Sequence, residues 1–317
     1  MNELKATRDG YGEALLELGE DKRVVVLDAD LSKSTRSEKF KKKYPERFFN
    51  VGIAEQNLIA TAAGLAASGK IPFASSFAVF ITGRAYGQIR LNAGISNLNI
   101  KIVGSHAGLL TGEDGASHQS LEDISLMRGI PGMTVIQPCD FIEAKKATKS
   151  IAKHKGPVYL RLLREKLPII NKEDYVFKIG KGVLLKPGND VAIIASGALV
   201  HEALKAHDEL KRENISARVI NIHTIKPIDQ EIIIKAAKET KAIITAEDHN
   251  IIGGLGSAVA EVLIKNYPIR ICMIGVNDRF GESGKPKELY KKYGLTKDNI
   301  IAKVKSLLRY KDKEVQK

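Results

Sequence analysis

Short apolar segments alternate with longer amphipathic segments along almost the whole chain. The apolar segments have the length of strands, whereas the segments between them repeat apolar residues at helical spacing. Alternation of this kind is typical of α/β proteins, in which a mostly parallel sheet is covered by helices on both faces. We therefore predict a doubly wound α/β fold.

The first part of the chain contains one run of this alternation. Its predicted strands are at 23–28, 48–51, 72–75, 100–104, 134–137 and 158–162. Its predicted helices are at 6–18, 35–43, 54–68, 80–95, 121–128 and 140–152. Because parallel strands need crossover connections, we expect these helices to link strands across the faces of one sheet.

The segment 164–190 interrupts the alternation and reads as an interdomain connection, since it has prolines and turn-forming clusters but no sustained helical period. A second alternating unit follows it. Its predicted strands are at 191–196, 217–222, 241–247 and 269–276, and its predicted helices are at 198–213, 228–238, 254–266 and 296–309. A length of 317 residues suits two domains, which we place at 1–178 and, for the smaller one, 179–317.

Composition is that of a soluble globular protein, with 44% hydrophobic and 27% charged residues. No apolar run reaches the length of a membrane span, and the first residues lack the pattern of a signal peptide. Cys139 and Cys272 lie far apart, and neither has a second cysteine at metal-ligand spacing. We therefore expect a cytoplasmic protein that has free thiols and no membrane partner.

The formal net charge of +13 favours acidic partners, such as nucleic acid or small phosphorylated molecules. A nucleic-acid interface is typically a compact basic cluster, often with interleaved aromatic residues. Here the lysines are dispersed, with the densest runs at 39–47 and after Leu308, and Trp is absent. We expect a lysine-rich solvated surface and no nucleic-acid partner, with attraction of sugar phosphates as a secondary effect.

Polar residues just after strands are the candidates for chemistry, because open α/β sheets bind ligands beyond the carboxyl ends of their strands. The first candidate is Glu55, which opens a helix after the strand at 48–51. The helix dipole is a sufficient structural explanation for an acidic residue at that place. The helix itself is almost wholly apolar and small, which predicts that it is buried. A poorly hydrated carboxylate at its start suits general acid–base work.

The second candidate is the glycine-rich loop at 104–119, which contains His106, Asp114 and His118. Long loops in compact domains are often functional. A zinc site is one alternative, but the loop has no tight ligand cluster and the chain has no cysteine pair. A structural role for either histidine is another. The third candidate is the pair Phe77 and Phe80 at helical spacing, for which core packing is the alternative.

Taken together and in this order, the three places resemble the pyrimidine-binding domain of transketolase. The matching segments are GIAEQN at 52–57, SFAVF at 76–80 and HAGLLTGEDGASHQSLED at 106–123. Residues 190–305 are similar to the transketolase C-terminal domain, so the resemblance covers nearly the whole chain. It implies a thiamine-diphosphate enzyme that transfers a two-carbon ketol unit between phosphorylated sugars.

The resemblance implies roles for the first and third places. Glu55 would bond N1′ of the cofactor aminopyrimidine, and His118 would lie near the reacting carbonyl group, so both would be catalytic. Phe77 and Phe80 would flank the pyrimidine ring, and Asp30 matches a position near the cofactor and the subunit contact. A third aromatic residue of the family pocket falls at Gly83, so the pocket is incomplete; Tyr86 lies one turn further on.

The resemblance also implies a substrate site. Asp114 would accept a hydrogen bond from the sugar C2 hydroxyl group, and His118 would contact the substrate near its carbonyl end. The group that would hold the substrate phosphate is Arg8, Ser34, His106 and Arg164. Guanidinium, hydroxyl and imidazole groups suit a dianion. Arg161 is the alternative to Arg164, because it lies close by in the same strand.

One family feature is missing. Thiamine-diphosphate enzymes hold Mg²⁺ and the diphosphate through a GDG motif, and this chain contains none. In transketolase that motif belongs to the N-terminal domain. We therefore expect no metal ligands here, and a separate N-terminal subunit that carries the motif and Mg²⁺, most simply in a dimer of heterodimers. A fragment of a longer protein is the other explanation.

Related enzymes are the main alternatives. The β subunits of 2-oxoacid dehydrogenases are not expected to have the H…GEDG..HQ..E pattern, and deoxyxylulose phosphate synthase lacks a histidine at the position of His106. A catalytically silent scaffold subunit is a third alternative, against which Glu55, His106, Asp114 and His118 argue. In the second unit, Glu247-Asp-His249 and the glycines at 253–256 lie at a strand end and a helix start, which could bind an anion. There we favour a structural role.

Overall fold

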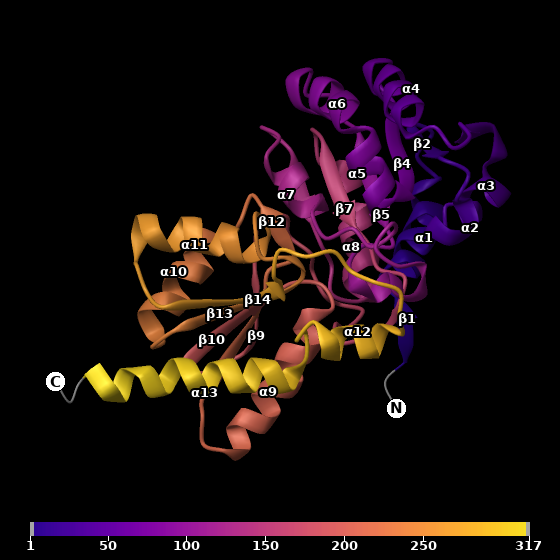
Figure 1. The fold of residues 1–317 in the computed structure, drawn as a ribbon. Helices are drawn as coiled ribbons and strands as arrows, with labels where there is room; N and C mark the ends of the chain where they lie inside the picture. The colour runs from indigo at the N-terminus through magenta and orange to yellow at the C-terminus, as the bar shows by residue number, and fades with distance from the viewer. Residues whose placement is uncertain (1–2, 315–317) are drawn as a thin grey trace.

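The computed structural model describes residues 3–314, in which two large sheets lie side by side, each covered by helices (Figure 1). The larger sheet has the strand order β12-β6-β7-β5-β4-β2-β3. Its neighbouring strands are parallel except at the edge, where β12 runs antiparallel to β6. The strands are β2 (Val24–Asp28), β3 (Phe48–Asn50), β4 (Ile71–Phe77), β5 (Lys101–Ser105), β6 (Thr134–Ile136), β7 (Val158–Arg161) and β12 (Thr224–Lys226).

Successive residues of the central strands pack alternately into two hydrophobic cores, one on each face of this sheet. In β2, Val24 and Val26 pack into one core, and Val25 and Leu27 pack into the other. The first core is closed by α1 (Thr7–Leu18), α3 (Glu38–Lys43) and α8 (Phe141–Lys153). The second is closed by α4 (Glu55–Ala67), α5 (Ala78–Arg84), a π-helix (Ile89–Ile95) and α7 (Asp123–Arg128). Short helices connect them: α2 (Ser32–Thr35), α6 (Tyr86–Gln88), and 3₁₀ turns at Pro45–Arg47 and Leu109–Asp114.

The second sheet has the order β14-β13-β10-β11-β9 and is parallel apart from the edge pair β11–β9. Its strands are β9 (Val183–Lys186), β10 (Val191–Ala195), β11 (Ala217–Asn221), β13 (Ile243–Asn250) and β14 (Ile271–Val276). Its helices are α9 (Leu199–Arg212), α10 (Gln230–Glu239), α11 (Leu255–Asn266), α12 (Pro286–Lys292) and α13 (Lys297–Glu314). Cores again lie on both faces. The predicted doubly wound α/β class is confirmed for both units.

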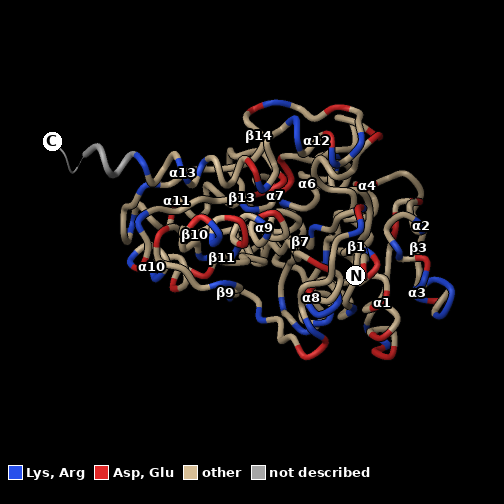
Figure 2. Tube along the Cα trace, turned by 90° about the horizontal axis from the view of Figure 1, so that it is seen from below, with Lys and Arg blue, Asp and Glu red and all other residues tan. Residues whose placement is uncertain are grey.

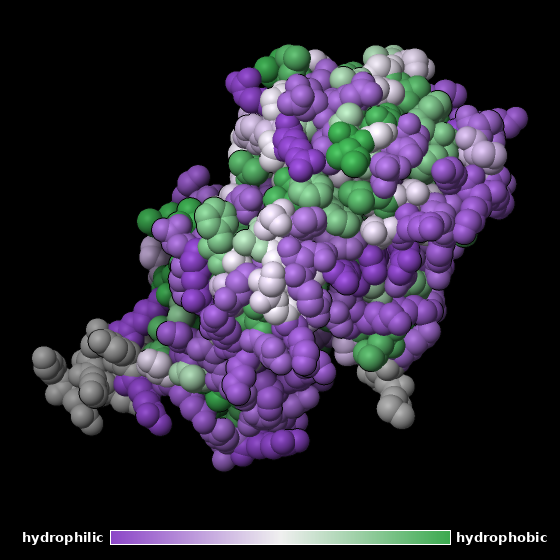
Figure 3. Space-filling view, turned by 45° about the vertical axis from the view of Figure 1, so that its right-hand side comes forward, coloured by the Kyte–Doolittle hydropathy of each residue, from purple (hydrophilic) through white to green (hydrophobic). Residues whose placement is uncertain are grey.

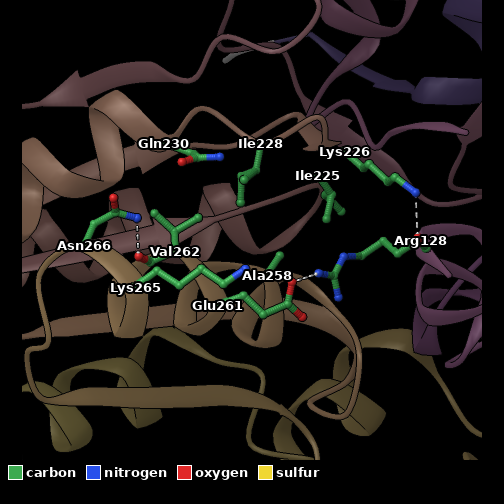
Figure 4. Close-up of a pocket in the computed structure, with 10 residues that line it drawn as sticks. All are labelled: Arg128, Ile225, Lys226, Ile228, Gln230, Ala258, Glu261, Val262, Lys265 and Asn266. Carbon is green, nitrogen blue, oxygen red and sulfur yellow. Dashed lines mark hydrogen bonds and ion pairs between the residues drawn. The ribbon is translucent and has the colours of Figure 1, made fainter. Parts of the chain in front are cut away.

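The two units are joined by more than the connecting segment. Strand β12 belongs to the second unit by sequence but completes the first sheet. At the end of this strand, the Lys226 ammonium group donates to the Arg128 backbone oxygen at 2.8 Å (Figure 4). It also donates to the Ile130 backbone oxygen at 2.6 Å. Arg128 in turn pairs with Glu261 of α11 at 2.8 Å. The groove of about 260 Å³ at this place therefore lies at the junction of the two units, which these side-chain contacts hold together.

Several predicted elements differ in detail. The segment 164–190 contains β8 (Lys166–Pro168), which pairs antiparallel with β1 (Leu4–Ala6), as well as β9. The helix expected at 35–43 begins only at Glu38, because Arg36 adopts a positive φ of 71°. The helix expected at 80–95 is divided between α5, α6 and the π-helix. The domain boundary at 178 and 179 stays a prediction.

Acidic and basic residues are interspersed along the chain, as Figure 2 shows. Many surface lysines have a carboxylate partner, for example Lys42 with Glu38 at 2.8 Å. Within residues 3–314, no helix has both the length and the apolar character needed to cross a membrane.

Candidate active site

Loops from neighbouring strands of the larger sheet meet at the carboxyl edge. The strands β5, β4 and β2 are adjacent and parallel, so the segments that follow them are brought together. Between these segments lies a pocket of about 420 Å³. Its lining residues are Arg8, Lys33, Ser34, Arg36, Phe77, His106, Asp114 and Arg164.

The pocket is rich in cations. The Arg8 Nη1 group donates to the Ser34 backbone oxygen at 3.0 Å and lies 3.2 Å from His106 Nε2. The Arg164 guanidinium pairs with Asp114 at 2.9 Å. Burial, with the charge of Arg36 nearby, lowers the pKa of Arg8 to about 10, which leaves the guanidinium charged at neutral pH.

His106 is buried in a neutral form. Burial and the neighbouring guanidinium groups of Arg8 and Arg164 lower the pKa of His106 to about 3. With Arg8 donating to Nε2, the proton belongs on Nδ1, which lies 2.9 Å from the Ser105 hydroxyl oxygen. His106 is therefore a neutral, oriented imidazole at the base of a positively charged pocket.

Aromatic contacts connect the pocket to the neighbouring helix. The Phe77 ring stacks on the His106 ring at a centroid distance of 3.9 Å and lies 5.8 Å from Phe80. His118 approaches Phe80 edge-on at 5.2 Å and Phe77 at 6.1 Å. Phe77 thus lines the pocket, and its ring stacks on both His106 and Phe80.

Glu55 begins α4 and is only 3% exposed. Its carboxylate accepts a hydrogen bond from the Ser76 hydroxyl group at 3.2 Å and pairs with Arg84 at 3.2 Å. The Arg84 guanidinium also lies over the Phe80 ring, 4.1 Å from the centroid. The carboxylate is therefore buried beside an aromatic ring, with one half-exposed arginine in contact with both.

The structure separates the two candidate arginines. Arg161 is fully buried, pairs with Asp123 at 2.7 Å and donates to the Ser120 and Asp248 backbone oxygens. It is part of the protein interior. Arg164, in contrast, lines the pocket.

Three other positions from the sequence lie outside the pocket lining. Asp30 is exposed and accepts a hydrogen bond from the Asn50 amide at 2.8 Å. Gly83 is exposed, and a Cβ atom added there would meet nothing within 4 Å. Tyr86 packs against the core beneath the π-helix, so it does not fill the space at Gly83.

The sequence did not point to Lys33, Arg36 or Arg84, which belong to no motif. It also missed Asp28, whose buried carboxylate accepts bonds from the Thr35 and Ser37 hydroxyl groups at 2.7 and 2.9 Å. Burial raises the pKa of Asp28 to about 6. This residue anchors the segment that presents the cations of 33–36. Among residues 3–314, no group of three or more His, Cys, Asp and Glu side chains is arranged to hold a metal ion.

Two family models match the chain. The transketolase pyrimidine-binding domain matches residues 3–169, and the transketolase C-terminal domain matches residues 180–300. The chain belongs to the transketolase family. The matched regions coincide with the two sheets described above, apart from the return of β12 to the first.

Individual relatives resemble the chain over its whole length. A putative transketolase C-terminal section of Methanocaldococcus jannaschii is 53% identical over 95% of this chain and 95% of its own. A 6-deoxy-6-sulfo-D-fructose transketolase subunit, SqwH, of a Clostridium species is 46% identical over 93% and 92%. A solved structure described as a split gene transketolase, inactive beta4 tetramer, is 51% identical, with a TM-score of 0.90 over 96% and 98%.

Membership of the transketolase family implies thiamine diphosphate, and the described residues fit its aminopyrimidine ring. The buried carboxylate of Glu55 and the half-buried ring of Phe80 both contact the Arg84 guanidinium. Gly83 belongs to the same helix as Phe80, α5, and the space beside it is open. Phe77 is covered by His106, so Phe80 is the aromatic residue whose face could stack on a ring once the half-exposed Arg84 guanidinium is displaced from it.

Proposed function

We propose that this chain is the C-terminal subunit of a split, thiamine-diphosphate-dependent transketolase. In the proposed reaction, a two-carbon ketol unit passes from a ketose phosphate to an aldose phosphate. The observation that carries the proposal is that Arg84 contacts both the buried Glu55 carboxylate and the Phe80 ring, while Phe77, which stacks on Phe80, lines the cationic pocket that contains His106 and Asp114.

The residues divide the work by chemistry. Bound thiamine diphosphate supplies the carbanion chemistry that a two-carbon transfer needs. Glu55 holds a proton at N1′ of the pyrimidine ring, and Arg84 must leave the Glu55 carboxylate and the Phe80 face when that ring binds. His118 contacts the sugar substrate near its reacting carbonyl group. Asp114 accepts a hydrogen bond from the neighbouring sugar hydroxyl group.

The opposite end of the sugar meets the cations. Arg8, Ser34, His106 and Arg164 are proposed to hold the phosphate, with Lys33 and Arg36 adding charge at the rim. A neutral His106 can bond a phosphate oxygen only by donation, so its present contact with Arg8 must rearrange on binding. Charge-assisted bonds from guanidinium groups to phosphate are strong and directional.

A partner subunit is proposed to supply the diphosphate and Mg²⁺ site. The sequence has no GDG motif. Exposed apolar side chains surround the Glu55 side of the molecule: Phe49, Ile53, Leu91 and Ile95 are between 39% and 76% exposed. Hydrophobic residues gather on this upper part of the molecule, over α4 and α6 (Figure 3). We propose that an N-terminal subunit covers them in a cytoplasmic dimer of heterodimers.

The name of one relative suggests a second substrate class. The SqwH relative is named for 6-deoxy-6-sulfo-D-fructose, whose terminal group is also an anion. A pocket of guanidinium and ammonium groups would attract either a phosphate or a sulfonate. The first candidates remain xylulose 5-phosphate and ribose 5-phosphate, the sugars of the pentose phosphate pathway.

Reconstitution tests the proposal. The chain alone should show little ketol transfer, in keeping with the relative described as an inactive beta4 tetramer. Addition of a GDG-bearing partner, thiamine diphosphate and Mg²⁺ should give activity on phosphorylated sugars, and Glu55→Ala should abolish it. Decarboxylation of pyruvate with glyceraldehyde 3-phosphate would instead assign a different reaction, and undiminished turnover of Glu55→Ala would refute the role of Glu55.

A further inference from the structure

The loop that carries His106, Asp114 and His118, here called the substrate loop (residues 104–119), has an unusual backbone. Gly108, Gly112 and Gly115 have φ angles of 76°, 78° and 74°, and His106 has 57°. These left-handed conformations are favourable only for glycine, and His106 adopts one at a cost. A backbone of this kind keeps its shape only where surrounding groups hold it.

The start of the substrate loop is held by its own unit. Ala107 N donates to the Leu162 oxygen at 3.2 Å, and Gly108 N donates to the Ser120 oxygen at 2.9 Å. From Leu109 onward the loop also has partners in the other unit, in addition to Arg164 of its own unit, which donates to the Thr111 oxygen at 3.1 Å. The Leu109 backbone N–H donates to the Asp248 carboxylate at 2.9 Å.

Asp248 lies near the end of β13 and is fully buried. Its second carboxylate oxygen accepts a hydrogen bond from the Tyr290 hydroxyl group of α12 at 3.0 Å. Its backbone oxygen accepts a bond from Arg161 at 3.0 Å. A Cβ atom added at Gly108 would come within 2.3 Å of the Asp248 carboxylate, so the loop and this side chain are in close contact.

The same unit also supports the middle of the loop. Gln119 bridges the Gly112 oxygen at 2.9 Å and the Glu282 oxygen at 3.0 Å through its side-chain amide. A Cβ atom at Gly112 would lie 3.2 Å from Pro286, and one at Gly115 would lie 2.5 Å from Ser283. Asp114 is therefore carried on a stretch whose inner side rests on the segment at 282–290.

We infer that Asp248 is a positioning residue for the substrate site, and that the C-terminal unit sets the shape of the substrate loop through it. Asp248 touches neither the pocket nor Glu55. Instead, it fixes the backbone at Leu109, between His106 and Asp114, and Tyr290 fixes Asp248. This inference rests on the proposed function for its catalytic meaning, whereas its structural content can be measured without any activity.

The structural test is amide hydrogen exchange on the isolated chain, followed by mass spectrometry over 104–119. Asp248→Ala should accelerate exchange in this loop by about tenfold or more, as expected when a buried hydrogen bond is lost. The matched control is Glu247→Ala. Glu247 is the adjacent, equally buried carboxylate, but it accepts bonds from Leu255 N and Gly256 N at the start of α11.

A conservative variant guards against general loss of folding. In Asp248→Asn, the amide oxygen can still accept the Leu109 N–H, and the amide nitrogen can donate to the Tyr290 oxygen. It should therefore retain loop exchange within about twofold of the wild type. Equal exchange in Asp248→Ala and Glu247→Ala would overturn the inference.

The functional test uses the reconstituted complex. Asp248→Ala should lower kcat/KM for the phosphorylated ketose by about tenfold or more, because the loop carries both Asp114 and His118. Faster loop exchange with an unchanged kcat/KM would overturn the positioning role. Failure of the proposed function would show differently, as a lack of ketol transfer by the wild-type complex, while the exchange comparison would still decide whether Asp248 holds the loop.

Discussion

Arg161 and Arg164 have the same side chain and lie three residues apart, yet their environments predict different roles, one in stability and one in substrate binding. Arg164 is 38% exposed at the pocket, and Arg161 is fully buried against Asp123. Arg164→Ala is expected to raise KM for phosphorylated sugars about tenfold or more while leaving stability nearly unchanged.

Arg161→Ala is expected to lower the free energy of unfolding instead, because it leaves the buried Asp123 carboxylate without its cationic partner. Loss of one partner of a buried pair costs about 3–5 kcal/mol. Urea unfolding of the two variants, alongside steady-state kinetics of the reconstituted complex, separates these effects. The assignment fails if Arg161→Ala is the stable variant with the raised KM.

His106 gives stability a pH dependence of known sign. The pKa of His106 falls to about 3 in the folded chain through burial and the nearby arginines, against about 6.5 in an unfolded chain. Below the unfolded pKa only the unfolded chain takes up the proton, so stability is lost as pH falls. Linkage gives a loss of about 2 kcal/mol between pH 7 and pH 5.

The variant His106→Gln cannot titrate and should lack this loss. The measurement is the free energy of unfolding by urea at pH 7 and pH 5 for both proteins. The wild type should lose about 2 kcal/mol more than the variant over this interval. Equal losses would mean that His106 is protonated in the folded chain.

At this scale the sequence could identify the residues that belong to motifs. Glu55, His106 and Asp114 follow strands within quoted segments, and the structure brings Arg8, Ser34, His106, Asp114 and Arg164 to one pocket. Arg84 belongs to no motif, and the segment Glu247-Asp-His249 drew attention only as a strand end, without any sign of the loop that Asp248 contacts. The importance of Arg84 and Asp248 comes from what they touch in space, and Asp248 meets its loop partner across a long interval of sequence.

Among the elements, the substrate loop makes the most specific demands on residue type. Gly108 combines a φ of 76° with a space that the Asp248 carboxylate already occupies. Gly108→Ala therefore meets both backbone strain, about 1–3 kcal/mol, and a steric conflict. It should destabilise the chain and raise KM for the sugar phosphate.

Gly69 supplies a matched control. It has a φ of 85°, and a Cβ atom there would meet nothing within 4 Å, so Gly69→Ala experiences the strain alone. Thermal unfolding of the two variants should give a clearly larger loss for Gly108→Ala. A similar loss in both would mean that contact with Asp248 does not constrain the loop.

The long periodic helices and the strands of the alternating pattern were predictable, and the strands outside that pattern were not. Helices α1, α4, α8, α9 and α11 were expected within about two residues of their observed ends, the usual uncertainty of helix boundaries. Strands β1, β8, β9 and β12 were missed. Each lies at an edge or in a two-stranded ribbon, where a few residues gain their pairing from a distant segment and carry no local period.

On the scale of the whole molecule, the exposed apolar residues around Glu55 predict where a partner binds. Ile95, which is 65% exposed at the end of the π-helix, and Ile53, which is 76% exposed before α4, belong to this patch. Ile95→Glu should weaken association with the GDG-bearing subunit by about tenfold or more, because a charge would be buried at the interface.

Ile264→Glu is the control, since Ile264 is 75% exposed on α11, far from α4 (Figure 1). Sedimentation or calorimetric titration of each variant with the partner gives the affinity. If Ile264→Glu weakens binding and Ile95→Glu does not, the partner covers a different face.

Strand β12 has a consequence for the making of the protein. Until residues 224–226 have left the ribosome, β6 is an open sheet edge with unpaired backbone groups. Such an edge invites pairing with other chains, and only the later part of the same polypeptide can seal it. The sheet of the first domain is therefore completed by a strand from the second. Expression of the first domain alone would leave an unpaired, aggregation-prone strand edge on the half of the protein that contains Glu55.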